Sequence, residues 1–533
     1  MHMSKEYLKQ QLDNKSSLRG LLFRRGYLLT TAKVTNTDDY PFYGLWRELS
    51  IDDRLHLYVH QNQTSYIFQE KDVTVSIIGH AYNPFDGVYD ENKLCQELLT
   101  AYQKGLDAYF DKLSEFTGLH VIILVDGSCV RVCQDACALT GCFHGIIDGN
   151  LYVAEHSQLI ADICNLDYNP TVFKLVKSRC YNIGNRHLPG NLTPYKELKR
   201  NGGNTYIEYD GKSIVTKRFF PVKPHPEFTS SEDKTACVKR IAELMHSGIE
   251  CCTKKWSNCA ISLTGGTDSK TTLACANGLY DKFQYFSFVS KPQEQVDANG
   301  AAELCRQLGL KHTLYPIPAE NSTFPDFELI KLILNHNSAY TQNNRDSEIR
   351  KFIYLHDHNY YDVELKSWAS EVPRVFLERK YQLKMPSVLT ERHCSIFQTR
   401  YFLHPLLLRW SDQQYYKFLR EIHLEKPLFN YEHTDSFYWE IRMGAWGQAV
   451  ISTQQIYHRM TIPMNNRKIL DMFLCLPREE RKRDDAHKAV MRVMNPKVVE
   501  AGIEIPNLYF HSYRIWMEKL YYLYRTFFYR PIR

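Results

Sequence analysis

The sequence has no continuous apolar run of the length that a membrane-spanning helix needs, which is about 18 residues, so we expect no transmembrane helix. Its first twenty residues are polar and charged, unlike a secretory signal. The net charge is only +6 over 533 residues, and basic residues do not cluster with aromatic ones. A nucleic-acid partner is therefore not expected.

The sequence also lacks the paired cysteine patterns that are typical of metal sites or of a disulfide framework. The 15 cysteines are scattered and odd in number. Cys129, Cys133, Cys137 and Cys142 lie close in sequence, but no CxxC pairs with a second CxxC or with HxxxH. Reduced, half-buried thiols are favoured over a zinc site. This pattern indicates a reducing compartment, so we predict a cytoplasmic protein.

The length and one proline-rich segment predict two domains. A chain of 533 residues exceeds the size at which single cores stop growing, about 250–300 residues. The segment 221–234 carries three prolines and then Ser-Ser-Glu-Asp, which is typical of a linker that enters a helix N-cap. We therefore predict domains at residues 1–222 and 230–533.

The two parts differ in their secondary-structure patterns. The first has β-rich runs bounded by Gly, Asp or Asn at 72–79, 119–127, 128–135 and 149–155, with helical spacing over 91–116, and is predicted to be α+β. In the second part strands alternate with helices, which predicts a doubly wound parallel α/β sheet. The predicted order is helix 233–252, strand 258–264, helix 268–279, strand 283–289, helix 297–308 and strand 311–317.

A short segment between the first strand and helix of this sheet carries the strongest functional signal. It is Thr264-Gly265-Gly266-Thr267-Asp268-Ser269. Ligands of open parallel sheets bind at the carboxyl ends of the strands. The two glycines would let the backbone approach a ligand and adopt positive φ, and the following helix would direct its N–H groups and dipole there. Hydroxyls of Thr264, Thr267 and Ser269 can donate hydrogen bonds. We predict a phosphate cradle, with Asp268 implying a bridging Mg²⁺.

Two phosphate-loop patterns can be compared with this segment. The Walker loop fails, because Thr264 and Ser269 stand where its glycines belong. The pyrophosphatase loop S-G-G-x-D-S fits when Thr264 replaces its serine, which keeps the hydroxyl. A tight strand-to-helix turn with an Asp/Ser cap is the structural alternative.

With this loop the chain resembles the asparagine synthetase B family. That family joins a glutaminase domain of the N-terminal-nucleophile type to an ATP-pyrophosphatase synthetase domain. Further segments are similar to the family in the same order, at 78–83, 96–116, 133–162, 192–220 and 297–312. The resemblance implies an α+β N-terminal-nucleophile-type domain, followed by a doubly wound ATP-pyrophosphatase domain with added helices.

The resemblance also implies site residues, with ATP and Mg²⁺ as cofactors. Thr264, Gly265, Gly266, Thr267 and Ser269 would hold the pyrophosphate, and backbone near Leu263, Phe288 and Val289 would hold the adenine. Asp268 and Glu371 would bind Mg²⁺. Glu371 is the one acid left where the family has S-G-E-G-x-D-E, and it could instead be a helix-start carboxylate; Arg374 could contact phosphate. Lys488, in "HKAVMR", would stabilise developing negative charge or be a solvated helix lysine.

The glutaminase residues of the family are missing. Its nucleophile is an N-terminal cysteine, whereas this chain has His2 and Met3, and its first cysteine is Cys95. The Asn-Gly oxyanion donors correspond to Ile78-Gly79, and the next glutamate corresponds to His80. Loss of the nucleophile and of an oxyanion donor removes several orders of magnitude in rate. We predict that the N-terminal domain is not a glutaminase.

The resulting prediction is a carboxylate-activating ligase. It would form an acyl-adenylate, release pyrophosphate and make an amide from ammonia or an amine, on a small molecule or peptide. β-Lactam synthetases and lasso-peptide cyclases, relatives without the nucleophile, imply ring closure within one molecule; amidation of a surface-polysaccharide sugar acid is the next interpretation. A catalytically silent binding or scaffold protein is the alternative. A homodimer, or a complex with a partner protein of the same pathway, is compatible with this prediction. The aromatic tail 513–533 would suit an interfacial helix, but packing on protein is favoured over membrane contact.

Overall fold

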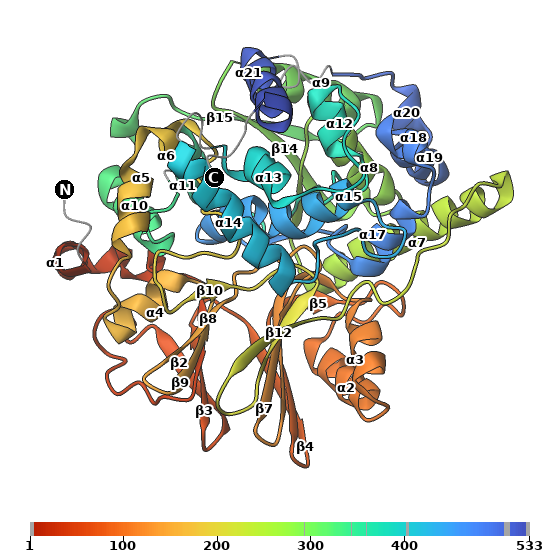
Figure 1. The fold of residues 1–533 in the computed structure, drawn as a ribbon. Coiled ribbons are helices and arrows are strands. Elements are labelled where there is room, and N and C mark those ends of the chain that lie inside the picture. The colour runs from red at the N-terminus through yellow and green to blue at the C-terminus, as the bar shows by residue number, and fades with distance from the viewer. Residues whose placement is uncertain are drawn as a thin grey trace.

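A computed structural model describes residues 5–292, 294–342, 344–358, 360–400, 405–505 and 512–528. In Figure 1 antiparallel strands fill one end of the molecule, and the helix-rich second half lies across the other end. Within the described residues, no helix is both long and apolar enough to span a bilayer.

Two six-stranded antiparallel sheets form the first part of the chain. The first sheet has the order β10-β8-β9-β1-β3-β2 and consists of β1 (Tyr27–Thr30), β2 (Trp46–Asp52), β3 (Leu55–His60), β8 (Phe143–Ile147), β9 (Asn150–Ala154) and β10 (Lys199–Arg200). The second has the order β12-β11-β7-β6-β5-β4 and consists of β4 (Ser65–Glu70), β5 (Val73–Tyr82), β6 (Thr117–Asp126), β7 (Cys129–Gln134), β11 (Thr205–Tyr209) and β12 (Ile214–Arg218).

The two sheets stack face to face with helices on both outer sides. Alternating apolar residues, such as Leu57 of β3 and Ile123 of β6, share one core between the sheets. The opposite face of the second sheet packs on α2 and α3, and that of the first packs on α1, α4 and α10 (Phe327–Asn337). The helices of this part are α1 (Lys5–Asn14), α2 (Glu91–Tyr102), α3 (Leu106–Leu113), α4 (Ser157–Cys164), α5 (Pro170–Lys177) and α6 (Arg179–Ile183), with the 3₁₀ turn η1 (Ser16–Leu21).

A five-stranded parallel sheet organises the second part. Its order is β15-β14-β13-β16-β17, formed by β13 (Cys259–Ser262), β14 (Phe283–Val289), β15 (His312–Pro316), β16 (Val363–Leu365) and β17 (Met460–Thr461). Alternate residues of β13 face opposite sides. Ile261 packs in the core formed with α7 (Ser231–Lys255), α8 (Thr267–Cys275) and α19 (Asp485–Met494), whereas Ala260 packs with Leu355 of α11 (Asp346–Asp357). Helices therefore cover both faces, as the doubly wound prediction requires.

The remaining elements of the second part are mostly helices. They are α7 (Ser231–Lys255), α8 (Thr267–Cys275), η2 (Tyr280–Lys282), α9 (Glu294–Gln307), η3 (Asn321–Thr323), α10 (Phe327–Asn337), α11 (Asp346–Asp357), α12 (Phe376–Tyr381), α13 (Glu391–Cys394), η4 (Ser395–Thr399), α14 (Pro405–Glu421), α15 (His433–Ser436), η5 (Phe437–Gly447), α16 (Gln448–Gln455), α17 (Arg467–Leu474), α18 (Arg478–Lys482), α19 (Asp485–Met494), α20 (Lys497–Glu500), α21 (Tyr513–Leu523) and η7 (Tyr524–Phe528).

Polar and apolar contacts tie the two parts together. Tyr82 and Leu139 of the first part belong to the same buried cluster as Ile261 and Ile451 of the second. The Tyr82 hydroxyl lies 3.1 Å from the Thr461 hydroxyl oxygen. The parallel sheet is thus anchored directly on the stacked sheets.

Most of the predicted elements are confirmed with small shifts at their ends. The four predicted strands of the first part correspond to β5, β6, β7 and β9. Strand 283–289 is β14 without change, and helix 233–252 lies within α7. Ser230 caps α7, its hydroxyl accepting from the backbone N–H of Asp233 at 3.0 Å, as Ser-Ser-Glu-Asp predicted. All 15 cysteines are free thiols.

Candidate functional site

The segment 264–269 lies at the carboxyl end of β13, the central strand. β14 pairs with one side of β13 and β16 with the other. The chain order reverses there, so the segment lies at the topological switch point, where open α/β sheets bind their ligands. Gly266 is the N-cap of α8, and the helix begins at Thr267.

The glycines do not have the backbone conformation predicted from the sequence. Neither Gly265 nor Gly266 has positive φ, and φ of Gly266 is −74°. A Cβ on Gly265 would lie 1.9 Å from Cδ1 of Ile505, whereas a Cβ on Gly266 would meet only the Thr264 hydroxyl oxygen at 3.2 Å. Gly265 is therefore required by close packing of a distant segment, and the open side of the loop is at Gly266.

Hydroxyl groups hold the loop in shape from within. The Ser269 hydroxyl donates to the Thr264 carbonyl at 2.7 Å and accepts from the Thr264 N–H at 3.1 Å. The Gly266 N–H donates to the Thr264 hydroxyl oxygen at 3.2 Å. These two hydroxyls act as internal braces of the loop.

Four backbone N–H groups of the loop are left without an acceptor. Within the described parts of the chain, no hydrogen bond is formed by the N–H groups of Gly265, Thr267, Asp268 or Ser269. Three of them belong to the first turn of α8, where the helix dipole is positive. This arrangement is the donor set that an anion at a helix N-terminus uses.

An acidic cluster surrounds Arg374 next to this loop. The guanidinium donates to Asp268, to Glu371 Oε1 at 2.6 Å, and to both oxygens of Asp484 at 2.6 and 2.7 Å. Ser370 donates to Asp268 Oδ1 at 2.5 Å. Three carboxylates from segments more than 100 residues apart thus converge on one buried cation.

The mutual contacts shift the pKa values of this cluster. Burial lowers the pKa of Arg374, but Asp268 and Glu371 outweigh it, so the net pKa is raised. Burial raises the pKa of Asp484, but the hydrogen bonds and charge of Arg374 outweigh it, so the net pKa is lowered. At neutral pH Arg374 is therefore charged and Asp484 is ionised. The pKa of Glu371 is raised by burial against the pull of Arg374.

Magnesium fits this site only in part. No group of three metal-binding side chains is available in the described residues, and the guanidinium of Arg374 occupies the centre of the carboxylates. Oδ2 of Asp268 forms no hydrogen bond to the described residues, and the side chain is one-third exposed. Mg²⁺ that arrives with phosphate needs only one or two protein oxygens, and Asp268 can provide one.

Lys488 does not point into the acidic cluster. It pairs with Glu504 at 3.1 Å, and its side chain is 33 % exposed. The preceding residue, His487, is fully buried, lies 3.4 Å from the Ser370 hydroxyl, and has a pKa lowered to about 4 by burial and by Arg374. The structure thus brings Asp268 and Glu371 together, places Lys488 beside the segment 501–505, and directs His487 inward.

The predicted adenine seat lies at the ends of β13 and β14. Leu263 already donates its N–H to Phe286 and accepts at its carbonyl from Ser287 Oγ at 2.7 Å. The Val289 carbonyl accepts from Ile317. The Lys351 ammonium lies 4.6 Å from the ring centre of Phe288. The N–H and the carbonyl of Leu263 therefore both already have hydrogen-bond partners in β14.

The residues that replace the family's glutaminase groups are buried in the stacked sheets. Ile78 belongs to the core between the sheets. Gly79 has φ of +95°, and a Cβ there would lie 2.3 Å from the Leu119 carbonyl. His80 packs edge-on against Trp256, with ring centres 5.2 Å apart, and burial lowers its pKa. The predicted His2 terminus lies outside the described residues.

The sequence did not reveal three members of the cluster, namely Ser370, Arg379 and Asp484. Arg379 lies 3.4 Å from both Glu371 and Asp484. The one usable signal was the acid pair Asp484-Asp485, which stands at the start of the helix that carries Lys488. Nothing local distinguishes it from a helix N-terminal acid.

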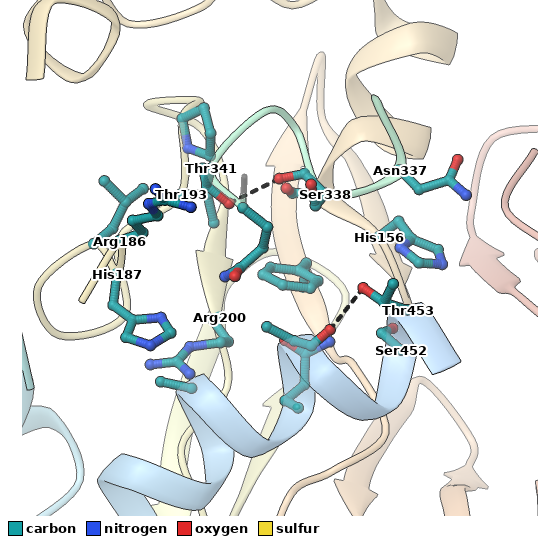
Figure 2. A pocket seen from close by; sticks show the side chains of 18 of the residues that line it. His156, Arg186, His187, Thr193, Arg200, Asn337, Ser338, Thr341, Ser452 and Thr453 are labelled. Atoms are coloured by element: carbon teal, nitrogen blue, oxygen red, sulfur yellow. Dashed lines mark hydrogen bonds between the residues drawn. The ribbon is translucent and has the colours of Figure 1, made fainter. Parts of the chain in front are cut away.

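A second cavity lies between the two parts of the chain. Its volume is about 90 Å³, and it is lined by β8, the start of α4, residues 186–194, β10, the end of α10 and α16. Figure 2 shows His156, His187, Arg200, Ser452 and Thr453 around this space. None of the residues that line it is an aspartate or glutamate.

The described geometry defines the class of architecture: stacked antiparallel sheets joined to a doubly wound parallel sheet, with a two-glycine loop at the switch point of the parallel sheet. No family model matches the chain, and no curated protein matches it. Solved structures that align with it include the glutamine phosphoribosylpyrophosphate amidotransferase from B. subtilis complexed with ADP and GMP, at 9% identity, with a TM-score of 0.24, over 56% of this chain and 61% of that one. The glutamine-dependent NAD+ synthetase from Acinetobacter baumannii in complex with ADP aligns at 13% identity, with a TM-score of 0.18, over 32% of each chain. The chain spans about three fifths of the amidotransferase. Likenesses at this level carry no argument about fold or function.

Proposed function

We propose that the loop 264–269 binds the phosphates of ATP and that the protein activates a carboxylate for amide formation, as the resemblance to the asparagine synthetase B family implies. The observation that carries the proposal is the set of four unpaired N–H groups at the switch point of the sheet. Mg²⁺ bound at Asp268 would neutralise part of the negative charge of the phosphates.

The proposed reaction has two steps. A carboxylate oxygen of the substrate attacks the α-phosphorus of ATP, the bond from this phosphorus to the bridging oxygen breaks, and pyrophosphate leaves. An amine nitrogen then attacks the acyl carbon, the bond to AMP breaks, and the ammonium proton passes to solvent. The chain would position the phosphates with its N–H groups, and Lys488 would need to turn from Glu504 to reach negative charge.

The nitrogen source and the substrate follow from the same proposal. Burial of Ile78 and His80 supports an N-terminal part, residues 1–222, that serves residues 230–533 as a scaffold and does not hydrolyse glutamine. The amine would then be ammonia, a second substrate or a group of the same molecule. We retain a small molecule or peptide with a carboxylate and an amine as the substrate class, in natural-product or surface-polysaccharide modification.

The nucleotide site can be tested without knowledge of the substrate. Thermal melting is measured with and without Mg²⁺ and α,β-methylene ATP, for the wild type, Asp268→Asn, and Asp281→Asn, which changes an exposed acid of the same sheet unit. Ligand at ~100 times its Kd should stabilise the native state by about 2.7 kcal/mol. The proposal requires a magnesium-dependent rise in the wild type and in Asp281→Asn that is lost in Asp268→Asn.

A catalytically silent binding protein is the second candidate, and Arg374 favours it. Its guanidinium neutralises the carboxylates that would otherwise be free for a metal. Absence of any nucleotide-dependent rise in melting, in the wild type as in the variants, would favour this candidate over the ligase.

A further inference from the structure

Arg200 places a half-buried positive charge on the wall of the second cavity. The residue lies in β10, and its guanidinium donates to the carbonyls of Gly444 and, at 2.7 Å, of Gly190. No carboxylate of the described residues pairs with it, and burial lowers its pKa to about 10. A half-buried guanidinium without a counter-ion creates a field that favours an anion.

Two titratable groups near the cavity do not cancel this field. Burial lowers the pKa of His187 to about 3, with Arg442, Arg200 and Arg400 lowering it further, so this wall residue is neutral. Ser452, another wall residue, donates to Glu155 Oε1 at 3.1 Å. Burial raises the pKa of Glu155 to about 8, so this carboxyl is mostly protonated at neutral pH and does not cancel the charge.

Unpartnered polar side chains face the same space. Gln448 and Ser157 line the cavity, are more than nine-tenths buried, and have no side-chain hydrogen bond to a described residue. Gln342, also on the wall, likewise has none. Buried amides and hydroxyls in native proteins are paired, so Gln448 and Ser157 require a ligand or water.

We infer that this cavity binds a small organic acid that carries hydroxyl groups. The carboxylate would lie toward Arg200, and the hydroxyl groups would pair with Gln448, Gln342 and Ser157. A cavity of about 90 Å³ has room for several water-sized groups, since one water requires about 10–15 Å³. The site lies between the two parts of the chain, where ligand sites are common, and it is independent of the nucleotide loop.

Three ligands with the same three-carbon skeleton test the inference. D-Glycerate, glycerol and propionate are titrated at millimolar concentration by calorimetry and by thermal melting into the wild type, Gln448→Met and the exposed control Gln307→Met. Glycerate should bind the wild type and the control at least tenfold more tightly than either of the other ligands, and Gln448→Met should lose about tenfold. Equal binding of all three ligands, or unchanged binding in a folded Gln448→Met, would overturn the inference.

An independent surface feature lies on α21 and η7, at the top of Figure 1. Of the 21 large apolar residues that are exposed in the described chain, seven lie within residues 513–528. Six of them follow the spacing of one helical face. The seven are Tyr513, Trp516, Met517, Leu520, Tyr524, Phe527 and Phe528.

The charged residues of 513–528 that reach the surface, Arg514 and Lys519, have one sign. Glu518 is the only acid of residues 513–533, and it is turned inward, 2% exposed, onto Lys380 and Arg400. Of the basic residues described in the same stretch, Arg514 is exposed, Lys519 is half-buried, and Arg525 is buried and paired with Asp412. An exposed face with Trp, Tyr and Phe, without exposed acids and with basic neighbours, is the composition of helices that lie in a lipid interface.

We propose that the face formed by these seven residues binds an anionic lipid surface, contrary to the expectation from the sequence. The rings would enter the headgroup region, and the cations would attract lipid phosphate. A protein groove offers no reason for the absence of exposed acids, so lipid is the occupant favoured by the charges.

Vesicle co-sedimentation tests this surface. The wild type, Trp516→Ser/Phe527→Ser/Phe528→Ser, and the control Tyr360→Ser/Phe429→Ser, which removes exposed aromatic residues elsewhere, are mixed with phosphatidylcholine vesicles with or without phosphatidylglycerol. The wild type and the control should bind the vesicles with phosphatidylglycerol more tightly than those without it. The triple variant should bind the anionic vesicles about tenfold more weakly than the wild type. A wild type that binds neither vesicle, or a triple variant that binds as the wild type does, would reject the proposal.

Discussion

Replacing Arg374 by alanine should convert the acidic cluster from a stabilising into a repulsive one. The substitution leaves Asp268, Glu371 and Asp484 without their shared cation, and Arg374 itself is only 5 % exposed. Removing one partner of a buried ion pair leaves an uncompensated buried charge. This lowers the free energy of unfolding by much more than the intact pair contributes to it.

The expected loss is about 3–5 kcal/mol, the range for breaking a buried charge network. For a unit of this size that corresponds to roughly 5–10 °C in the melting temperature. Arg379→Ala is the matched control. Its contacts to Glu371 and Asp484 are both 3.4 Å, longer than charge-assisted hydrogen bonds of 2.7–2.9 Å. We expect less than about 1 kcal/mol from it.

Divalent cations provide the decisive arm of this experiment. In Arg374→Ala the three carboxylates form an oxygen-rich site, so millimolar Ca²⁺ or Mg²⁺ should recover part of the lost melting temperature. In nucleotide-free wild type, where the guanidinium is present, these ions should not change the melting temperature. An Arg374→Ala variant as stable as the wild type, or one that ignores both ions, would refute the view that this arginine stands in for a metal.

Two further predictions concern packing and pH. Gly265→Ala should cost about 1–3 kcal/mol, because its Cβ would lie 1.9 Å from Ile505; thermal melting should show the loss, and a Gly265→Ala/Ile505→Ala double variant should regain it. Five fully buried histidines have pKa values lowered to about 3–4 by burial, so the native state disfavours their protonation. Their contribution to the free energy of unfolding should be fully present above pH 6.5. It should fall toward pH 4 by up to about 1.36 kcal/mol per pH unit for each histidine. Urea midpoints that rise on acidification would contradict this. These histidines are His120, His144, His156, His187 and His487.

Features that depend on neighbouring residues were predictable from the sequence. Ser230 and the acids after it identified the start of α7, and the β-rich run 283–289 matched β14 to the residue. The alternation of strands and helices predicted the parallel sheet, because periodicity reports which faces are buried. The backbone conformation of Gly265 was predicted wrongly, since a glycine can be required by positive φ or by close packing, and the sequence pattern does not separate the two.

The sequence by itself determined that a strand, a two-glycine loop with hydroxyls and a carboxylate, and a helix follow one another, because each step is specified within a few residues. Only the tertiary structure decided what surrounds that loop. Ile505 packs on Gly265, and Arg374 joins Asp268 to Asp484, although these residues lie more than 100 positions from the loop or from each other. Local propensity acts along the chain, whereas packing and charge pairing act through space. The environment of the cradle therefore belongs to the fold of the whole chain.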